Sequence, residues 1–163
     1  MLSGCTSAPP APPADIAITF QHREPITLNV AKIEHVDRYQ ATLRPPYVEH
    51  LHRVTPSMVI RAWIKERLRA VGSRGLVTLI VEEAGVVEEA VSVSDGLGGL
   101  FRDEVDTRLI GVIRARFDHV DVGPLGGTHS VDVVAEASTE VLESATLNER
   151  DLAYFHLVER LAG

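Results

Sequence analysis

Histidines close to other polar residues are the side chains whose types and spacing could do chemistry in this chain. His50 and His52 are one residue apart, and alternate residues of an extended segment share a face. His35 and His119 are each followed two positions later by an aspartate. Imidazole and carboxylate groups bind zinc, but a zinc site needs three or four ligands that converge. These spacings do not force convergence, so we expect structural or solvated histidines and no metal or other cofactor.

Hydrolytic catalysis would need a nucleophile, a base and an orienting group within reach of one another. Ser130 follows His129, but neighbours in a strand point to opposite faces. The sequence has no Gly-x-Ser-x-Gly elbow. The glutamate pairs at 82–83 and 88–89 are typical of solvated strand edges. We therefore expect a protein that is not an enzyme, and a hydrolase stays an open alternative.

The segment 95–101, Asp-Gly-Leu-Gly-Gly-Leu-Phe, is the most glycine-rich loop of the chain. A phosphate-binding loop lies between a strand and a helix N-terminus, whereas a strand pattern follows this segment. Grouped exposed apolar residues often mark a contact surface. We therefore predict that the loop presents Leu97, Leu100 and Phe101 to a partner or a lipid surface. The alternative is that Leu100 and Phe101 fold back onto the core.

Cys5 is the only cysteine, and it follows Leu2-Ser3-Gly4. Small residues before a cysteine are typical of the bacterial lipobox, where the signal peptide is cut and the thiol accepts a diacylglycerol. Residues 6–14 consist of threonine, serine, alanine and proline, as a tether would. We therefore predict lipidation of Cys5, with an arbitrary N-terminus carrying a free thiol as the alternative. Only four residues precede Cys5, so this prediction requires further leader sequence upstream.

A basic line is predicted along the first helix. Arg61, Lys65 and Arg69 recur at intervals of four residues, which places them on one helix face. Because the chain carries a net charge of −7, a local basic surface could face anionic headgroups or an acidic partner. The alternative is an ordinary solvated helix face.

Length and composition limit the class of protein. We divide the 163 residues into a signal-peptide remnant (1–4), a lipidated cysteine with its tether (5–14) and one domain (15–163). The net charge of −7 argues against nucleic acid as a partner, because a phosphate backbone needs a basic surface. No apolar run approaches the roughly 18 residues that would indicate a spanning helix. We therefore expect attachment to the membrane through lipid alone.

Hydrophobic periodicity predicts strands, a helix, more strands and a final helix. Strands are expected at 16–20 and 26–36, followed by an irregular crossing segment over 38–54. Thr55 and Pro56 form a helix start, and an apolar stripe runs from Ile60 to Val71 before Gly72 ends the helix. Residues 76–93 read as one strand bent at Gly85 by a bulge, or as two short strands.

The second half of the chain predicts a hairpin and a helix. Alternating apolar residues over 105–117 and 131–141 indicate two long antiparallel strands joined by a loop. Thr146 and Glu149 have the spacing of a capping box, which starts a final helix. Its Leu152, Phe155, Val158 and Leu161 are expected to face the sheet. The element order predicts an α+β two-layer sandwich, a mainly antiparallel sheet with two helices on one face.

The lipobox, the tether and this element order resemble small outer-membrane lipoproteins of Gram-negative bacteria. The strand sequence Leu28 to Glu34 and the loop Gly96 to Phe101 resemble those of uncharacterised alphaproteobacterial lipoproteins. The element order is also similar to that of YajG-like lipoproteins and of auxiliary lipoproteins of lipid-trafficking ABC transporters. The resemblance implies an anchored protein on the periplasmic side of the outer membrane, and it brings no catalytic residue.

Two functions follow as expectations. The first is a non-enzymatic binding or assembly protein whose domain contacts another envelope protein. The second is a carrier or transport accessory that holds an acyl chain or another apolar ligand between the sheet and the helices. A cavity of about 300 Å³ or more would favour the second function.

Overall fold

The computed structural model describes residues 17–91, 105–123 and 126–163. Cys5 and the loop residues Leu97, Leu100 and Phe101 therefore lie outside the described residues. The elements, in chain order, are β1 (Ile26–Leu28), β2 (Lys32–Asp37), the 3-10 helix η1 (Glu49–Leu51), α1 (Pro56–Arg67), β3 (Leu68–Ala70), β4 (Leu76–Ala90), β5 (Val105–Val120), β6 (Thr128–Leu142) and α2 (Leu147–Ala162).

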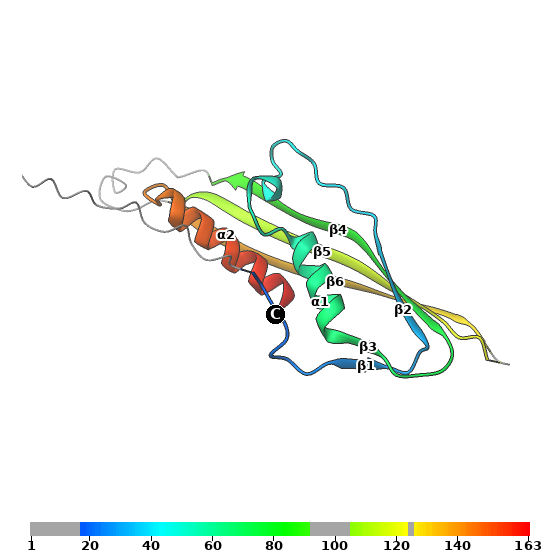
Figure 1. Cartoon of the computed structure of the whole chain (residues 1–163). Coiled ribbons are helices and arrows are strands. Elements are labelled where there is room, and N and C mark those ends of the chain that lie inside the picture. Colours follow the sequence, from blue (N-terminus) through cyan, green and yellow to red (C-terminus); the bar gives the residue numbers. More distant parts are fainter. Residues whose placement is uncertain (1–16, 92–104, 124–125) are drawn as a thin grey trace, which may run out of the picture.

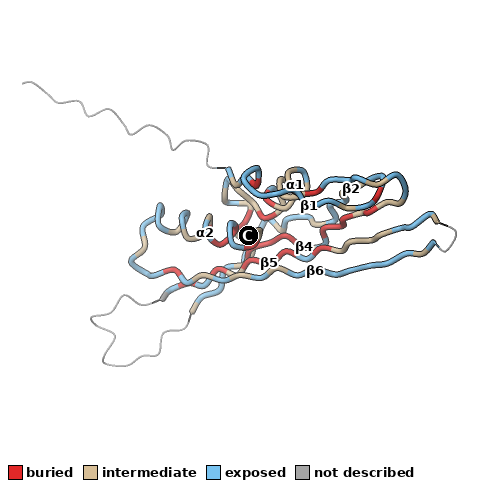
Figure 2. The backbone as a smooth tube through the Cα atoms, turned by 90° about the horizontal axis from the view of Figure 1, so that it is seen from below, coloured by how far each residue is buried: buried red, intermediate tan, exposed pale blue. Residues whose placement is uncertain are grey.

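The main sheet has the strand order β2-β4-β5-β6. Strands β4, β5 and β6 are antiparallel, whereas β2 joins β4 in parallel. Helices α1 and α2 cover the same face of this sheet (Figures 1 and 2). The predicted α+β two-layer sandwich is therefore confirmed. Within the described residues, no helix is long and apolar enough to cross a membrane.

The core lies between α2 and the middle of the sheet. Val86, Leu109 and Val141 project from three neighbouring strands and meet Leu157 of α2. Helix α2 lies so close to the sheet here that a Cβ added at Gly111 would be 2.6 Å from the Leu161 side chain. Burial of these apolar side chains holds the two layers together.

The N-terminal strand predictions are wrong in their extents. Residues 17–20 form no strand, although Phe20 is buried in the core. The strand predicted over 26–36 is split, because the chain changes sheets at Val30. There β1 pairs with β3 in a separate two-stranded sheet, and β2 pairs with β4. Sequence periodicity does not show which partner a strand takes.

Helix α1 begins as predicted and ends early. The Thr55 hydroxyl accepts a hydrogen bond from the Met58 N–H, and Pro56 occupies the first turn. The helix ends at Arg67 rather than near Gly72, because Leu68 begins β3. The Arg69 guanidinium donates to the carbonyls of Lys65 and Leu68 at this end of the helix, where the last carbonyls have no partner within the helix itself.

The three long strands agree closely with the sequence pattern. Residues 76–90 form one strand, but the bulge lies between Val81 and Glu83 and not at the predicted Gly85. Strands β5 and β6 form the predicted antiparallel hairpin. Across the strands, Arg114 pairs with Glu83 at 2.6 Å and Arg116 with Asp132 at 2.8 Å. These ion pairs lie on the sheet face opposite the helices.

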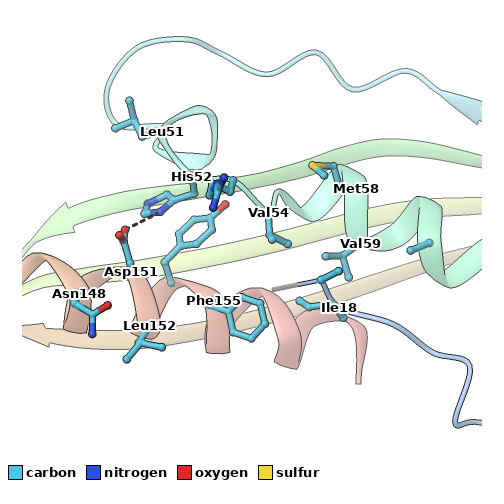
Figure 3. A pocket seen from close by; sticks show the side chains of 14 residues that line it. Ile18, Leu51, His52, Val54, Met58, Val59, Asn148, Asp151, Leu152 and Phe155 are labelled. Carbon is cyan, nitrogen blue, oxygen red and sulfur yellow. Dashed lines mark ion pairs between the residues drawn. The ribbon is translucent and has the colours of Figure 1, made fainter. Parts of the chain in front are cut away.

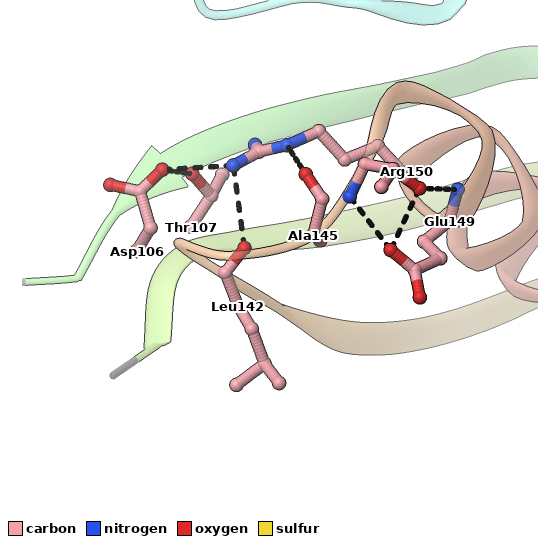
Figure 4. A network of polar contacts seen from close by, with 7 residues as sticks. Asp106, Thr107, Leu142, Ala145, Glu149 and Arg150 are labelled. Atoms are coloured by element: carbon pink, nitrogen blue, oxygen red, sulfur yellow. Dashed lines mark hydrogen bonds and ion pairs between the residues drawn. The ribbon is translucent and has the colours of Figure 1, made fainter. Parts of the chain in front are cut away.

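Helix α2 has the predicted capping box (Figure 4). The Thr146 hydroxyl accepts from the Glu149 N–H, and the Glu149 carboxylate accepts from the Thr146 N–H. The Thr146 N–H and hydroxyl both donate to the Glu149 carboxylate, and these two hydrogen bonds lower the pKa of Glu149. The prediction for the buried face is partly wrong, because Leu152 and Phe155 are not core residues. The buried positions are Tyr154, Leu157, Val158 and Leu161.

Candidate functional site

A groove of about 540 Å³ lies between the start of α1 and the outer side of α2 (Figure 3). Most of its lining is aliphatic or aromatic. The polar residues gather at one end, where His52 and Asp151 meet. The lining residues are Ala17, Ile18, Leu51, His52, Arg53, Val54, Met58, Val59, Ala62, Asn148, Asp151, Leu152, Tyr154 and Phe155.

Local sequence signals position the two walls. The cap at Thr55 starts α1 directly after Val54, so Met58 is presented one turn into the helix. The capping box at Thr146 starts α2, so Leu152 and Phe155 share a face at a spacing of three residues. The walls are therefore two helix starts, each fixed by its own cap.

The polar end of the groove is built around His52. Its ring stacks on the ring of Tyr154, with centroids 3.5 Å apart. Its Nδ1 lies 3.3 Å from the Asp151 carboxylate. Burial lowers the pKa of His52, and the nearby Asp151 carboxylate opposes this shift only in part. The imidazole is therefore neutral near pH 7 and donates its Nδ1 proton to Asp151.

A buried carboxylate supports the segment that carries His52. Glu49 is only 1% exposed, and it accepts hydrogen bonds from the Tyr39 hydroxyl (2.5 Å) and the Val86 N–H (3.2 Å). Burial and this hydrogen bond raise the pKa of Tyr39. Burial likewise raises the pKa of Tyr154, whose hydroxyl has no hydrogen-bond partner among the described residues. Through its hydrogen bond with the Val86 N–H, Glu49 holds the 3-10 turn against strand β4.

The lowered pKa of His52 predicts a loss of stability in mild acid. Its pKa lies below the ordinary value of 6.5 in the folded protein, so the unfolded chain binds the proton first as the pH falls. This contribution is complete above about pH 6.5 and is lost as the pH falls from there through the folded pKa. Urea titrations at pH 7.5 and pH 5 give the free energy of unfolding at each pH. The decrease between pH 7.5 and pH 5 should be smaller for His52→Phe than for the wild type. An unchanged difference would contradict the prediction.

The predicted basic line is not continuous. Arg61 and Lys65 lie on α1, whereas Arg69 lies in β3 beyond the helix end. The Arg61 guanidinium pairs with Asp37 at 3.1 Å, and Arg69 binds backbone carbonyls. The structure therefore does not bring the three side chains into one basic surface on one helix. Partner binding by any of them remains a prediction.

The candidate polar groups do not gather into one site. Ser130 donates to Asp118 at 2.7 Å on one face of β6, while His129 stacks on His119 on the other. This arrangement confirms that Ser130 and His129 point to opposite faces. Among the described residues, no three His, Cys, Asp or Glu side chains lie close enough together to hold a metal ion.

A smaller apolar pocket of about 210 Å³ lies between the sheet and the helices. This is where we expected an apolar ligand to bind. Ile60 and Trp63 of α1 and Phe117 of β5 line it, together with Leu161 near the end of α2. It is below the size of about 300 Å³ expected for such a site. The larger groove lies between the two helices instead.

Sequence reasoning missed the groove because it gave α2 a single apolar face. Leu152 and Phe155 lie beside Tyr154, Val158 and Leu161, so the apolar arc is wider than one sheet contact needs. The width of this apolar arc is the feature of the sequence that indicates a second apolar surface on α2.

Neither a protein-family model nor a curated protein sequence matches this chain. Among solved structures, the chain is similar to the rare lipoprotein B from Shewanella oneidensis. The two share 7% sequence identity with a TM-score of 0.37, over 80% of this chain and 85% of that one. This weak likeness concerns the fold alone. It does not bear on the YajG-like and ABC-transport resemblances.

Proposed function

We propose that this chain is a lipid-anchored, non-enzymatic protein on the periplasmic side of the outer membrane, and that its domain binds the acyl chain of an amphiphile. The groove between α1 and α2 is the observation that carries the binding proposal. The lipobox-like sequence at Cys5 supports the anchor.

The lining of the groove fits an amphiphile. Its volume of about 540 Å³ lies within the usual range for small-molecule sites. Val54, Met58 and Phe155 offer an apolar surface to an acyl tail. His52 and Asn148 offer hydrogen-bonding groups to a polar head at the other end (Figure 3). This role corresponds to a carrier or accessory of lipid transport.

The test is binding of a fluorescent polyene fatty acid to the full chain carrying Cys5→Ala, so that the protein's own acyl chains do not compete. Met58→Gln and Leu152→Gln together should weaken binding about thirtyfold, because each loses about 1 kcal/mol of apolar contact. Both side chains are partly exposed, so the fold should tolerate the change.

Leu43→Gln is the matched control, because Leu43 is 73% exposed and does not line the groove. It should bind the fatty acid as the unsubstituted chain does. Equal binding by the double variant would place the acyl chain elsewhere, and the absence of saturable binding would remove the carrier proposal.

Assembly with another envelope protein is the second candidate function. It is favoured by a different part of the molecule, the hairpin end that the helices do not cover (Figure 1). Exposed valines occur toward that end on both faces of the sheet, and exposed apolar residues are common in contact surfaces. These valines are Val120, Val122, Val131, Val133 and Val134.

A further inference from the structure

Strand β6 forms one edge of the main sheet, because it pairs only with β5 among the described strands. Two arginines of α2 reach this edge. Arg160 donates to the Ser138 carbonyl at 2.8 Å. Arg150 donates to the Leu142 carbonyl at 3.4 Å (Figure 4). In an antiparallel strand the N–H and C=O of one residue point to the same side, and this side alternates along the chain. Even-numbered residues of β6 therefore direct their backbone groups outward.

The two arginines cover only the half of the edge that lies next to α2. Toward the hairpin end, Ser130, Asp132, Val134 and Glu136 direct their N–H and C=O groups away from β5. Proteins usually protect such an edge with proline, lysine, a bulge or a covering element. Residues 128–136 contain neither proline nor lysine, and their register with β5 is continuous. Among the described residues, no other backbone group hydrogen-bonds to this half of the edge, so its outward groups are available to a further strand.

The side chains of this segment define what a pairing strand would carry. Val131 and Val133 are exposed on the helix side of the sheet. Asp132 and Glu136 lie on the opposite side. Asp132 already pairs with Arg116 of β5, whereas Glu136 faces Val112 without an ion pair in the described part of the chain. A complementary strand would present apolar residues on the helix side and a basic residue beside Glu136 on the other.

A second copy of this chain does not fit that description. Antiparallel pairing of two β6 edges about Val134 would place Asp132 of each copy opposite Glu136 of the other. In every register a second copy would bring further carboxylates and no cation, because residues 128–136 contain neither lysine nor arginine. Like charges directly opposite each other destabilise strand pairing. The occupant is therefore a strand of a different protein.

We propose that the β6 edge from Ser130 to Glu136 binds an extended basic segment of another envelope protein by strand addition. Main-chain hydrogen bonds would supply affinity, and the alternation of valines and carboxylates would supply specificity. This inference rests on the second candidate function, assembly with an envelope protein, and is independent of the groove.

The probe is a capped seven-residue peptide that alternates lysine and valine, with a glutamate–valine peptide of the same length as its counterpart. Titration into the ¹⁵N-labelled full chain carrying Cys5→Ala should shift the backbone amides of 130–136. Val134→Pro should weaken binding about tenfold or more, because it removes one outward N–H without removing a bond to β5. Val134→Ala, which keeps that N–H, should retain most of the affinity.

Glu136→Lys is a second variant that keeps the backbone intact, and it should weaken binding of the lysine peptide. Fatty-acid binding by Val134→Pro should be unchanged, which separates failure of this site from loss of the fold or of the groove function. Four results would overturn the proposal: equal binding by Val134→Pro, equal binding of the glutamate peptide, shifts confined to other strands, or dimers of the chain that Val134→Pro abolishes.

Discussion

Replacing Leu157 with alanine should lower the free energy of unfolding by about 3 to 4 kcal/mol. Leu157 is fully buried at the centre of α2, and the Leu157 side chain packs against the core residues of β4, β5 and β6. Helix and sheet are already in close contact at Gly111, so the layers cannot move together to fill the cavity. Urea unfolding followed by circular dichroism would measure the change.

Leu147→Ala is the matched control for this prediction. It removes the same atoms from the same helix, but Leu147 is 83% exposed. Its unfolding free energy should stay within about 0.5 kcal/mol of the wild type. Similar losses in both variants would show that α2 is stabilised by its own helix propensity and not by packing on the sheet.

Replacing Cys5 with alanine, in a chain that carries a complete upstream leader, should abolish lipid attachment completely. The thiol of Cys5 is the only one in the chain, so no other side chain can take the diacylglycerol. Labelling with a clickable fatty acid, followed by membrane fractionation, would measure the loss. The wild type should fractionate with the outer membrane, since Thr6 is not the aspartate that retains lipoproteins in the inner membrane of enteric bacteria.

Ser7→Ala serves as its control, because it changes the tether and leaves the thiol in place. This variant should take up label as the wild type does, and all three proteins should have the same far-ultraviolet circular dichroism. If the wild type takes up no label and fractionates as soluble material, the lipobox interpretation is wrong.

The sequence by itself determined the elements whose signals are local. Thr55 with Pro56, and Thr146 with Glu149, mark the two helix starts by hydrogen bonds within one turn. Alternation over two long segments specified the β5–β6 hairpin, because apolar residues recur on one face of each segment and each strand pairs with its neighbour in sequence. These features depend on residues a few positions apart or on adjacent elements.

The candidate sites required the tertiary structure. Leu152, Phe155 and Leu157 are all apolar residues of α2, but Leu157 packs in the core whereas Leu152 and Phe155 line the groove. The position of α1 beside α2 determines this difference. Likewise, the split of residues 26–36 into β1 and β2 follows from pairing with β3 and β4, more than 40 residues away. Apolar periodicity shows which side chains share one face of a helix or strand. The pattern is the same whether that face lies in the core, lines a groove or forms an open sheet edge. Only the three-dimensional arrangement distinguishes them, because burial is a property of what packs against the residue.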